Sequence, residues 1–176
     1  MKMNTANKLT ILRVIMIPAF LLVLYLNIPY ANYWALVIFA LASITDTLDG
    51  YIARHYNQVT DFGKFMDPLA DKMLVLAAMC FFVENGQMAG WAVAIVLFRE
   101  FAVSGMRLLA VEQGKVIAAA WSGKVKTFAT MICLIVMIVV NVNIINIIST
   151  VIIVGTTVYS GVEYLYVNRA VFKEAN

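Results

Sequence analysis

Four aspartates in this chain have the spacing of a catalytic or metal-binding site. Asp46 and Asp49 are three residues apart, and Asp67 and Asp71 are four apart. On a helix, residues three or four apart project from one face, so each pair would present two carboxylates side by side. Both pairs lie at one end of a long apolar stretch, where a buried charge costs ~2.5–3.5 kcal/mol on membrane-insertion scales. Carboxylates at such positions need a physical reason to be there.

The two aspartate pairs are expected on neighbouring antiparallel helices, because only a short link separates them. Facing each other, the helices would bring four carboxylates to one point, and these cannot all stay ionised in a low-dielectric site. They would have to take up protons or bind cations. Oxygen ligands suit hard cations such as Mg²⁺, Mn²⁺ or Ca²⁺, and two such ions can grip a pyrophosphate. Gly50, Ala53 and Gly63 continue the same faces, and small residues let a flat ligand approach the backbone.

A simpler interpretation is that the aspartates cap helices or lie in solvated loops. Asp67 directly precedes Pro68, an arrangement typical of a helix start. This interpretation explains any one aspartate well. It does not explain four at helical spacing with three small residues in phase, so we favour the metal site.

The composition is that of a membrane protein. Of 176 residues, 63% are hydrophobic and only 13% charged, and the mean hydropathy is +0.88. A soluble domain of this size needs a larger polar surface. We therefore expect a single all-α membrane domain over residues 1–176, built from six transmembrane helices. The predicted spans are about 11–26, 32–54, 63–83, 88–111, 124–140 and 144–166.

Basic residues occupy alternate links of this predicted bundle. They occur in the N-terminal segment, at the span ends that flank the second link (Arg54 and Lys64), in the link after the fourth span, and in the C-terminal tail, whereas the other three links and their flanks have none. The positive-inside rule then places both termini and the aspartates on the cytoplasmic side. The net charge of +3 is accounted for by these positions, so no nucleic-acid partner is expected. Pro18 interrupts the first apolar run and no small-residue cleavage site follows, which favours a spanning helix over a cleaved signal.

Sulfur and imidazole ligands are scarce in the sequence. Cys80 and Cys133 lie inside apolar runs, there is no CxxC pair, and the chain has one histidine. A zinc site built from thiolates or imidazoles is therefore not expected.

The aspartates belong to a longer pattern, DTLDGYIAR, followed after eight residues by GKFMDPLAD. This pattern resembles the signature of the CDP-alcohol phosphotransferase family, in which two spans supply the active site. Eight fixed positions at fixed spacing make a specific match, and none departs from the pattern. The matching residues are Asp46, Asp49, Gly50, Ala53, Arg54, Gly63, Asp67 and Asp71.

The resemblance implies a reaction and a set of ligands. A CDP-linked lipid would donate its phosphatidyl group to an alcohol, and CMP would leave, with two divalent cations, Mg²⁺ or Mn²⁺, in the site. Asp46, Asp49 and Asp67 would bind metal. Asp71 would bind metal or take the proton from the attacking hydroxyl.

The resemblance also implies a binding site for the donor, CDP-diacylglycerol. Small residues of the signature would line its cytidine nucleotide pocket, and Arg54 would pair with a phosphate or an acid. The donor-binding residues would be Asp46, Asp49, Gly50, Ala53, Arg54, Gly63, Asn7 and Thr10.

Segments outside the signature resemble the bacterial branch of the family that makes phosphatidylglycerophosphate. They are NKLTILR (7–13), REFAVSGMRLLA (99–110), GKVKT (123–127) and SGVEYLY (160–166). The likeness covers nearly the whole chain. It implies sn-glycerol 3-phosphate as the acceptor, a homodimer, and a place in the bacterial cytoplasmic membrane with the active site facing the cytoplasm.

A dianionic acceptor requires cations in its pocket. Arg107, Lys124 and Lys126 lie near the predicted cytoplasmic ends of the fourth and fifth spans, and with Arg13 they are candidates to hold the acceptor phosphate. Topology signalling explains the same residues equally well.

Glu100 lies near the middle of the fourth span, next to Arg99. Two roles are open for it: a buried structural ion pair with Arg99, or a place facing the site, where it would orient Arg107 or the acceptor glycerol.

Other functions compete with this prediction. The same chemistry could use inositol phosphate, serine or phosphatidylglycerol as the acceptor. A small ion-coupled transporter would spread polar residues across the membrane, whereas these acids cluster at one end of a helix pair. A purely structural membrane protein has no need of four convergent carboxylates.

Overall fold

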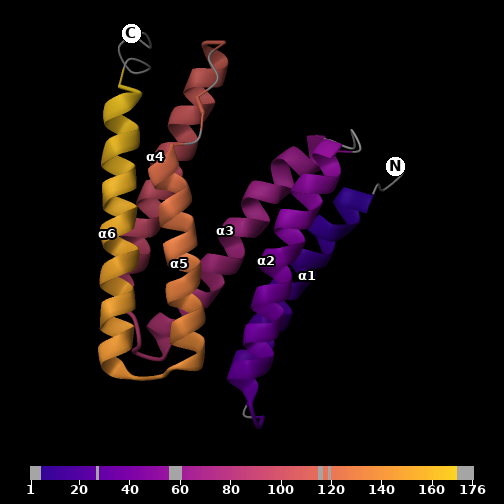
Figure 1. The fold of residues 1–176 in the computed structure, drawn as a ribbon, viewed down its shortest axis with the longest axis vertical. Helices are drawn as coiled ribbons and strands as arrows, with labels where there is room; N and C mark the ends of the chain where they lie inside the picture. Colours follow the sequence, from indigo (N-terminus) through magenta and orange to yellow (C-terminus); the bar gives the residue numbers. More distant parts are fainter. Residues whose placement is uncertain (1–4, 27, 56–60, 115–116, 119, 170–176) are drawn as a thin grey trace. The chain divides into compact units, whose positions relative to one another are not determined.

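The protein is described by a computed structural model that covers residues 5–26, 28–55, 61–114, 117–118 and 120–169. Within these ranges, helix is the only regular secondary structure, which confirms the all-α prediction (Figure 1). The helices are α1 (Thr5–Tyr25), α2 (Ala31–His55), α3 (Asp61–Glu84), α4 (Gly90–Glu112), α5 (Trp121–Val139) and α6 (Asn143–Val167).

Most helices start earlier in the chain than their apolar runs predict. α1 begins at Thr5 and α5 at Trp121, because the residues that precede each apolar run are helical as well. α3 begins at Asp61, so Asp67 lies inside the helix. The interpretation of Asp67 as a helix cap is therefore wrong.

In the part of the chain that the structure describes, three helices are long and apolar enough to cross a membrane: α1 over Asn7–Tyr25, α5 and α6. α2 contributes a shorter apolar segment, Ala31–Thr45, before its polar end. α4 carries three charged residues between Arg99 and Arg107, which lowers its hydropathy. The chain is therefore a membrane protein.

The described residues form two compact units, Met1–Phe81 and Phe82–Asn176. In the first, α1 and α2 form an antiparallel hairpin and lie side by side (Figure 1). Phe20 and Phe39 pack across it with ring centroids 5.7 Å apart, and both are fully buried. Tyr25 meets Phe81 of α3 edge-to-face at 5.3 Å. Aromatic contacts thus hold this unit together far from the signature residues.

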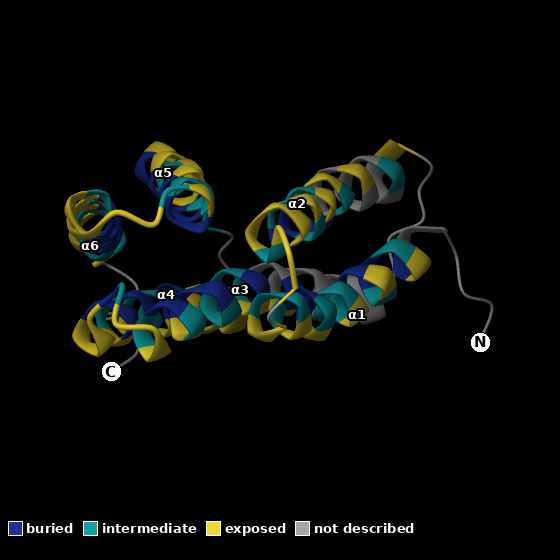
Figure 2. Ribbon diagram, turned by 90° about the horizontal axis from the view of Figure 1, so that it is seen from below, coloured by how far each residue is buried: buried dark blue, intermediate teal, exposed yellow. Residues whose placement is uncertain are grey.

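In the second unit, α6 contacts both α4 and α5. Each of these helices combines a buried and an exposed face (Figure 2). A small hydrophobic core joins α4 to α6, and its buried members are Val103, Met106, Ala110 and Tyr164.

The buried face of α6 is rich in small polar side chains. Small residues let membrane helices approach closely, and hydroxyl groups can be satisfied by the helix's own carbonyls. Thr150 Oγ1, for example, donates to the Asn146 carbonyl at 2.8 Å. The buried polar residues of α6 are Asn146, Ser149, Thr150, Thr157 and Ser160.

Gly161 of α6 makes room for the side chain of Arg99 of α4. A Cβ added at Gly161 would lie 3.1 Å from Arg99 Cγ, whereas one added at Gly155 would meet no atom within 4 Å. Arg99 is held from the other side as well, because Glu100 Oε1 accepts a hydrogen bond from its Nη1. The α4–α6 contact therefore depends on the absence of a side chain at position 161.

This contact predicts different effects for two substitutions in the same helix. Gly→Ala raises helix propensity equally at both positions, so their difference isolates the clash. We expect Gly161→Ala to be less stable than Gly155→Ala by about 1–2 kcal/mol. Thermal unfolding of the purified variants in one detergent measures this. Equal midpoints would show that Arg99 does not pack against Gly161.

Candidate active site

All eight signature residues lie on helices. Asp46 and Asp49 are in the second half of α2, and Asp67 and Asp71 are in the first half of α3. α2 ends at His55 and α3 begins at Asp61, so the two sets are separated by one short link. The side chains of the signature residues are outside the part of the chain that the structure describes. Their convergence on one point therefore stays a prediction.

The N-terminal half of α1 buries a polar stripe. Asn7, Thr10 and Arg13 follow one another at intervals of three residues, and they are 4%, 1% and 0% exposed. Burying an arginine completely is costly, so this face must meet polar groups. Asn7 and Thr10, two of the residues predicted to bind the donor, therefore share one buried face with Arg13, which is predicted to bind the acceptor.

The register of the α1–α2 hairpin relates this stripe to the signature. From the Phe20–Phe39 contact, seven residues back along α1 lead to Arg13, and seven forward along α2 lead to Asp46. Antiparallel helices rise by the same amount per residue, so these two positions lie at about the same level. Thr10, one turn further, lies level with the second aspartate of α2. The polar half of α1 thus packs beside the polar half of α2.

A buried ion-pair cluster joins α4 to α5. Glu100 Oε1 accepts hydrogen bonds from Lys126 Nζ at 2.6 Å and from Arg99 Nη1 at 3.1 Å. The three side chains are 15%, 7% and 12% exposed. Glu100 therefore forms the buried ion pair with Arg99, which is one of the two roles predicted for it. Lys126 is a further partner of the same carboxylate. Removing one member would leave an uncompensated buried charge.

Arg107 has a different environment from Lys126. Its Nε–H donates to the Tyr164 hydroxyl at 3.0 Å, and its guanidinium carbon lies 5.5 Å from the centre of the same ring. The residue as a whole is exposed, as is Lys124. Arg107 and Lys124 are thus accessible to an anion, whereas the ammonium of Lys126 is held by Glu100.

Tyr164 lies in the SGVEYLY segment, but the sequence did not single it out as a functional residue. It is 2% exposed and it orients Arg107. A tyrosine in an apolar helix gives no signal of its own. Its position one turn after Ser160 and Gly161, on the small-residue face of α6, is the pattern that could have indicated it.

Sequence comparison identifies the family. The family model that describes CDP-alcohol phosphatidyltransferases matches residues 3–159 of this chain. The chain belongs to the CDP-alcohol phosphatidyltransferase family. The resemblance inferred from the signature is therefore confirmed, and the protein is an enzyme of the phosphatidyltransferase class.

Relatives within the family align over most of the chain. A CDP-diacylglycerol–glycerol-3-phosphate 3-phosphatidyltransferase of Bacillus subtilis is 37% identical over an alignment of 191 positions, gaps included, which covers 98% of this chain and 99% of the relative. The Escherichia coli K12 protein of the same name is 42% identical over 139 residues, 76% of each chain. A probable phosphatidylglycerophosphate synthase of Mycobacterium tuberculosis H37Rv is 38% identical over 169 residues, 92% of this chain and 80% of the relative.

Members of this phosphatidyltransferase family use divalent metal, and the donor set of this chain suits it. The four signature aspartates offer only carboxylate oxygens, the ligands that Mg²⁺ and Mn²⁺ prefer. Among the side chains that the structure does describe, no three His, Cys, Asp or Glu residues gather closely enough to hold a metal ion. The aspartate pairs of α2 and α3 are thus the candidate metal ligands.

Proposed function

We propose that this enzyme transfers the phosphatidyl group of CDP-diacylglycerol to sn-glycerol 3-phosphate, giving phosphatidylglycerophosphate and CMP. A hydroxyl oxygen of the acceptor forms the new bond to phosphorus, and the bond from phosphorus to the CMP oxygen breaks. The observation that carries the proposal is the alignment with relatives that have this named activity, over as much as 98% of the chain. The complete signature on α2 and α3 supports the reaction class.

The four aspartates have the central role in this proposal. When bound, two divalent cations, Mg²⁺ or Mn²⁺, neutralise charge on the pyrophosphate and on the leaving CMP. Asp46, Asp49, Asp67 and Asp71 hold them. Asp71 also accepts the proton of the acceptor hydroxyl, since an ordinary alcohol needs a base within reach. Positioning and charge neutralisation then account for most of the catalysis.

The donor site follows from the α1–α2 hairpin. Gly50, Ala53 and Gly63 leave space for the cytidine nucleotide, and Arg54 pairs with a phosphate or an acid. Asn7 and Thr10 complete the site from α1. The burial of Asn7 and Thr10 on the face of α1 that packs beside α2 supports their inclusion.

Four basic side chains are the proposed ligands of the acceptor phosphate. Arg107 and Lys124 are the exposed candidates, and the hydrogen bond from Arg107 to Tyr164 fixes its guanidinium in place. Lys126 also takes part, with its ammonium hydrogen-bonded to Glu100. Arg13, level with the first aspartate of α2, contributes from the donor side.

The membrane arrangement is part of the same proposal. Residues 1–176 form one catalytic domain whose six helices all span the bacterial cytoplasmic membrane, with both termini and the active site on the cytoplasmic side. The alternation of basic and uncharged links supports this topology. The enzyme acts as a homodimer.

Head-group analysis tests the choice of acceptor. Purified enzyme in detergent with CDP-diacylglycerol and Mg²⁺ is offered labelled glycerol 3-phosphate, inositol phosphate, serine or phosphatidylglycerol in separate reactions. We expect labelled lipid product only with glycerol 3-phosphate, together with an equal amount of CMP. Faster product formation with any other acceptor would contradict the proposed specificity while leaving the reaction class intact.

The role of Asp71 predicts a separation of binding from turnover. We expect Asp71→Asn to insert, fold and bind CDP-diacylglycerol, but to lose turnover by roughly 10²-fold or more. Glu112→Gln is the matched control, because Glu112 is an exposed carboxylate at the end of α4. Product formation and donor binding are measured on the same preparations. Near-normal turnover of Asp71→Asn would remove this residue from the mechanism.

The acceptor site predicts a selective change in the Michaelis constant. Arg107→Ala and Lys124→Ala should each raise the KM for glycerol 3-phosphate roughly tenfold, because each removes a charge-assisted hydrogen bond. The KM for the donor should stay unchanged. Arg169→Ala serves as the control, since Arg169 is exposed and stacks on Tyr166 at 4.6 Å. An unchanged acceptor KM would exclude the substituted residue from the pocket.

A further inference from the structure

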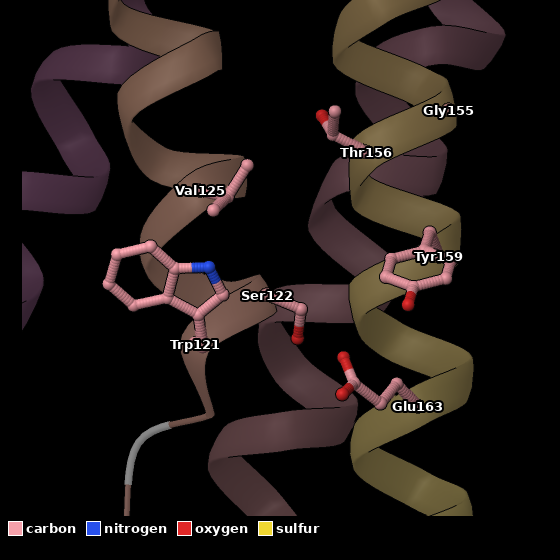
Figure 3. A pocket seen from close by; sticks show the side chains of 7 residues that line it. All are labelled: Trp121, Ser122, Val125, Gly155, Thr156, Tyr159 and Glu163. Atoms are coloured by element: carbon pink, nitrogen blue, oxygen red, sulfur yellow. The ribbon is translucent and has the colours of Figure 1, made fainter.

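A cavity of about 370 Å³ opens between α5 and α6, within the second unit. Its lining includes Trp121 and Ser122 from α5, and Thr156, Tyr159 and Glu163 from α6 (Figure 3). None of these residues belongs to the proposed catalytic or substrate-binding set. The volume is enough for a small polar group such as a lipid head group.

Several polar atoms of the cavity can accept hydrogen bonds. Glu163 Oε2 is buried and has no hydrogen-bond partner among the described residues, and the same holds for the hydroxyl of Ser122, a residue only 8% exposed. Thr156 Oγ1 donates its proton to the Ile152 carbonyl at 2.8 Å, which leaves the oxygen as an acceptor. Figure 3 shows the Ser122 and Glu163 side chains pointing toward one another across the gap. Buried acceptors without partners are costly, so a ligand that carries donors would be stabilised here.

The charge of the cavity favours a cationic ligand. Of the described residues that line the cavity, only Glu163 is charged, and it has no ion pair among the residues that the structure describes. Trp121 and Tyr159, 76% and 67% exposed, flank the opening with their rings. A carboxylate together with aromatic rings attracts an ammonium group, by ion pairing and by cation–π contact. A phosphate would be repelled by the carboxylate.

The position of the cavity indicates where such a ligand comes from. Both α5 and α6 are long and apolar enough to cross a membrane. Trp121 is the first residue of α5, and Glu163 lies near the end of α6 at Val167, so the cavity is at one end of the helix pair. Lipid head groups occupy this depth, and Trp and Tyr are enriched there.

We propose that the cavity between α5 and α6 binds the ammonium head group of an aminophospholipid, with Glu163 as its counter-ion. Ser122 and Thr156 accept hydrogen bonds from the ammonium, and Trp121 and Tyr159 cover it. This site shares no lining residue with the proposed substrate sites. It gives the enzyme a direct contact with a zwitterionic lipid that is neither its substrate nor its product.

Binding of two lipids that differ only at the head-group amine tests the proposal. Full-length protein in detergent is titrated with dihexanoyl-phosphatidylethanolamine and with its N-acetyl derivative, and bound lipid is counted by native mass spectrometry. We expect the wild type to bind the ammonium lipid roughly fivefold to tenfold more tightly. Glu163→Gln should abolish this preference. Glu112→Gln, which removes an exposed carboxylate elsewhere in the same unit, should keep it.

Three results would overturn the proposal. Equal binding of the two lipids by the wild type excludes an ammonium site, and this arm needs no variant. A folded Glu163→Gln variant that keeps the preference excludes the counter-ion role. A changed oligomeric state of Glu163→Gln on size exclusion, with the lipid preference intact, would assign the cavity to a contact between copies of the chain. If Glu163→Gln does not fold, Tyr159→Leu replaces it, because Tyr159 is exposed and its loss should reduce the preference.

Discussion

The repulsion among four carboxylates in an apolar protein is the constraint on which the account of this enzyme depends. Two aspartates on α2 and two on α3 are tolerable together only if cations or protons balance their charge. An active site that must bind a pyrophosphate has a use for the same cations. On our proposal, the carboxylates that would be a defect in a structural membrane protein are the source of catalysis. The family assignment and the chemistry of the donor set agree on this point.

The packing around the signature fits this requirement. The α1–α2 hairpin is fixed by aromatic contacts at the end away from the signature, and its other half is polar on both helices. In the second unit, the basic residues differ in how far they are buried. Arg99 and Lys126 both pair with Glu100 inside the unit, while Arg107 is held on the surface by Tyr164. The exposed guanidinium of Arg107 thus remains available to an anionic substrate.

Much of this could be predicted from the sequence, because apolar runs and the spacing of the aspartates are local patterns. The six helices and the family followed from them, with errors at helix ends such as Asp61, where polar residues continue the helix. The pairing of Lys126 with Glu100 was not predicted, since it joins residues of two helices and depends on how their faces meet. The cavity beside Glu163 was missed for the same reason. Patterns within one helix are readable from sequence, whereas contacts between helices need coordinates.

Binding of Mn²⁺, followed by electron paramagnetic resonance on the purified enzyme, tests the central claim most directly. The wild type should bind about two ions per chain, and a variant with asparagine in place of Asp46, Asp49, Asp67 and Asp71 should bind none at the same concentration. Equal Mn²⁺ binding by a folded variant and the wild type would show that these aspartates do not form the metal site. The account of the reaction centre would then be wrong.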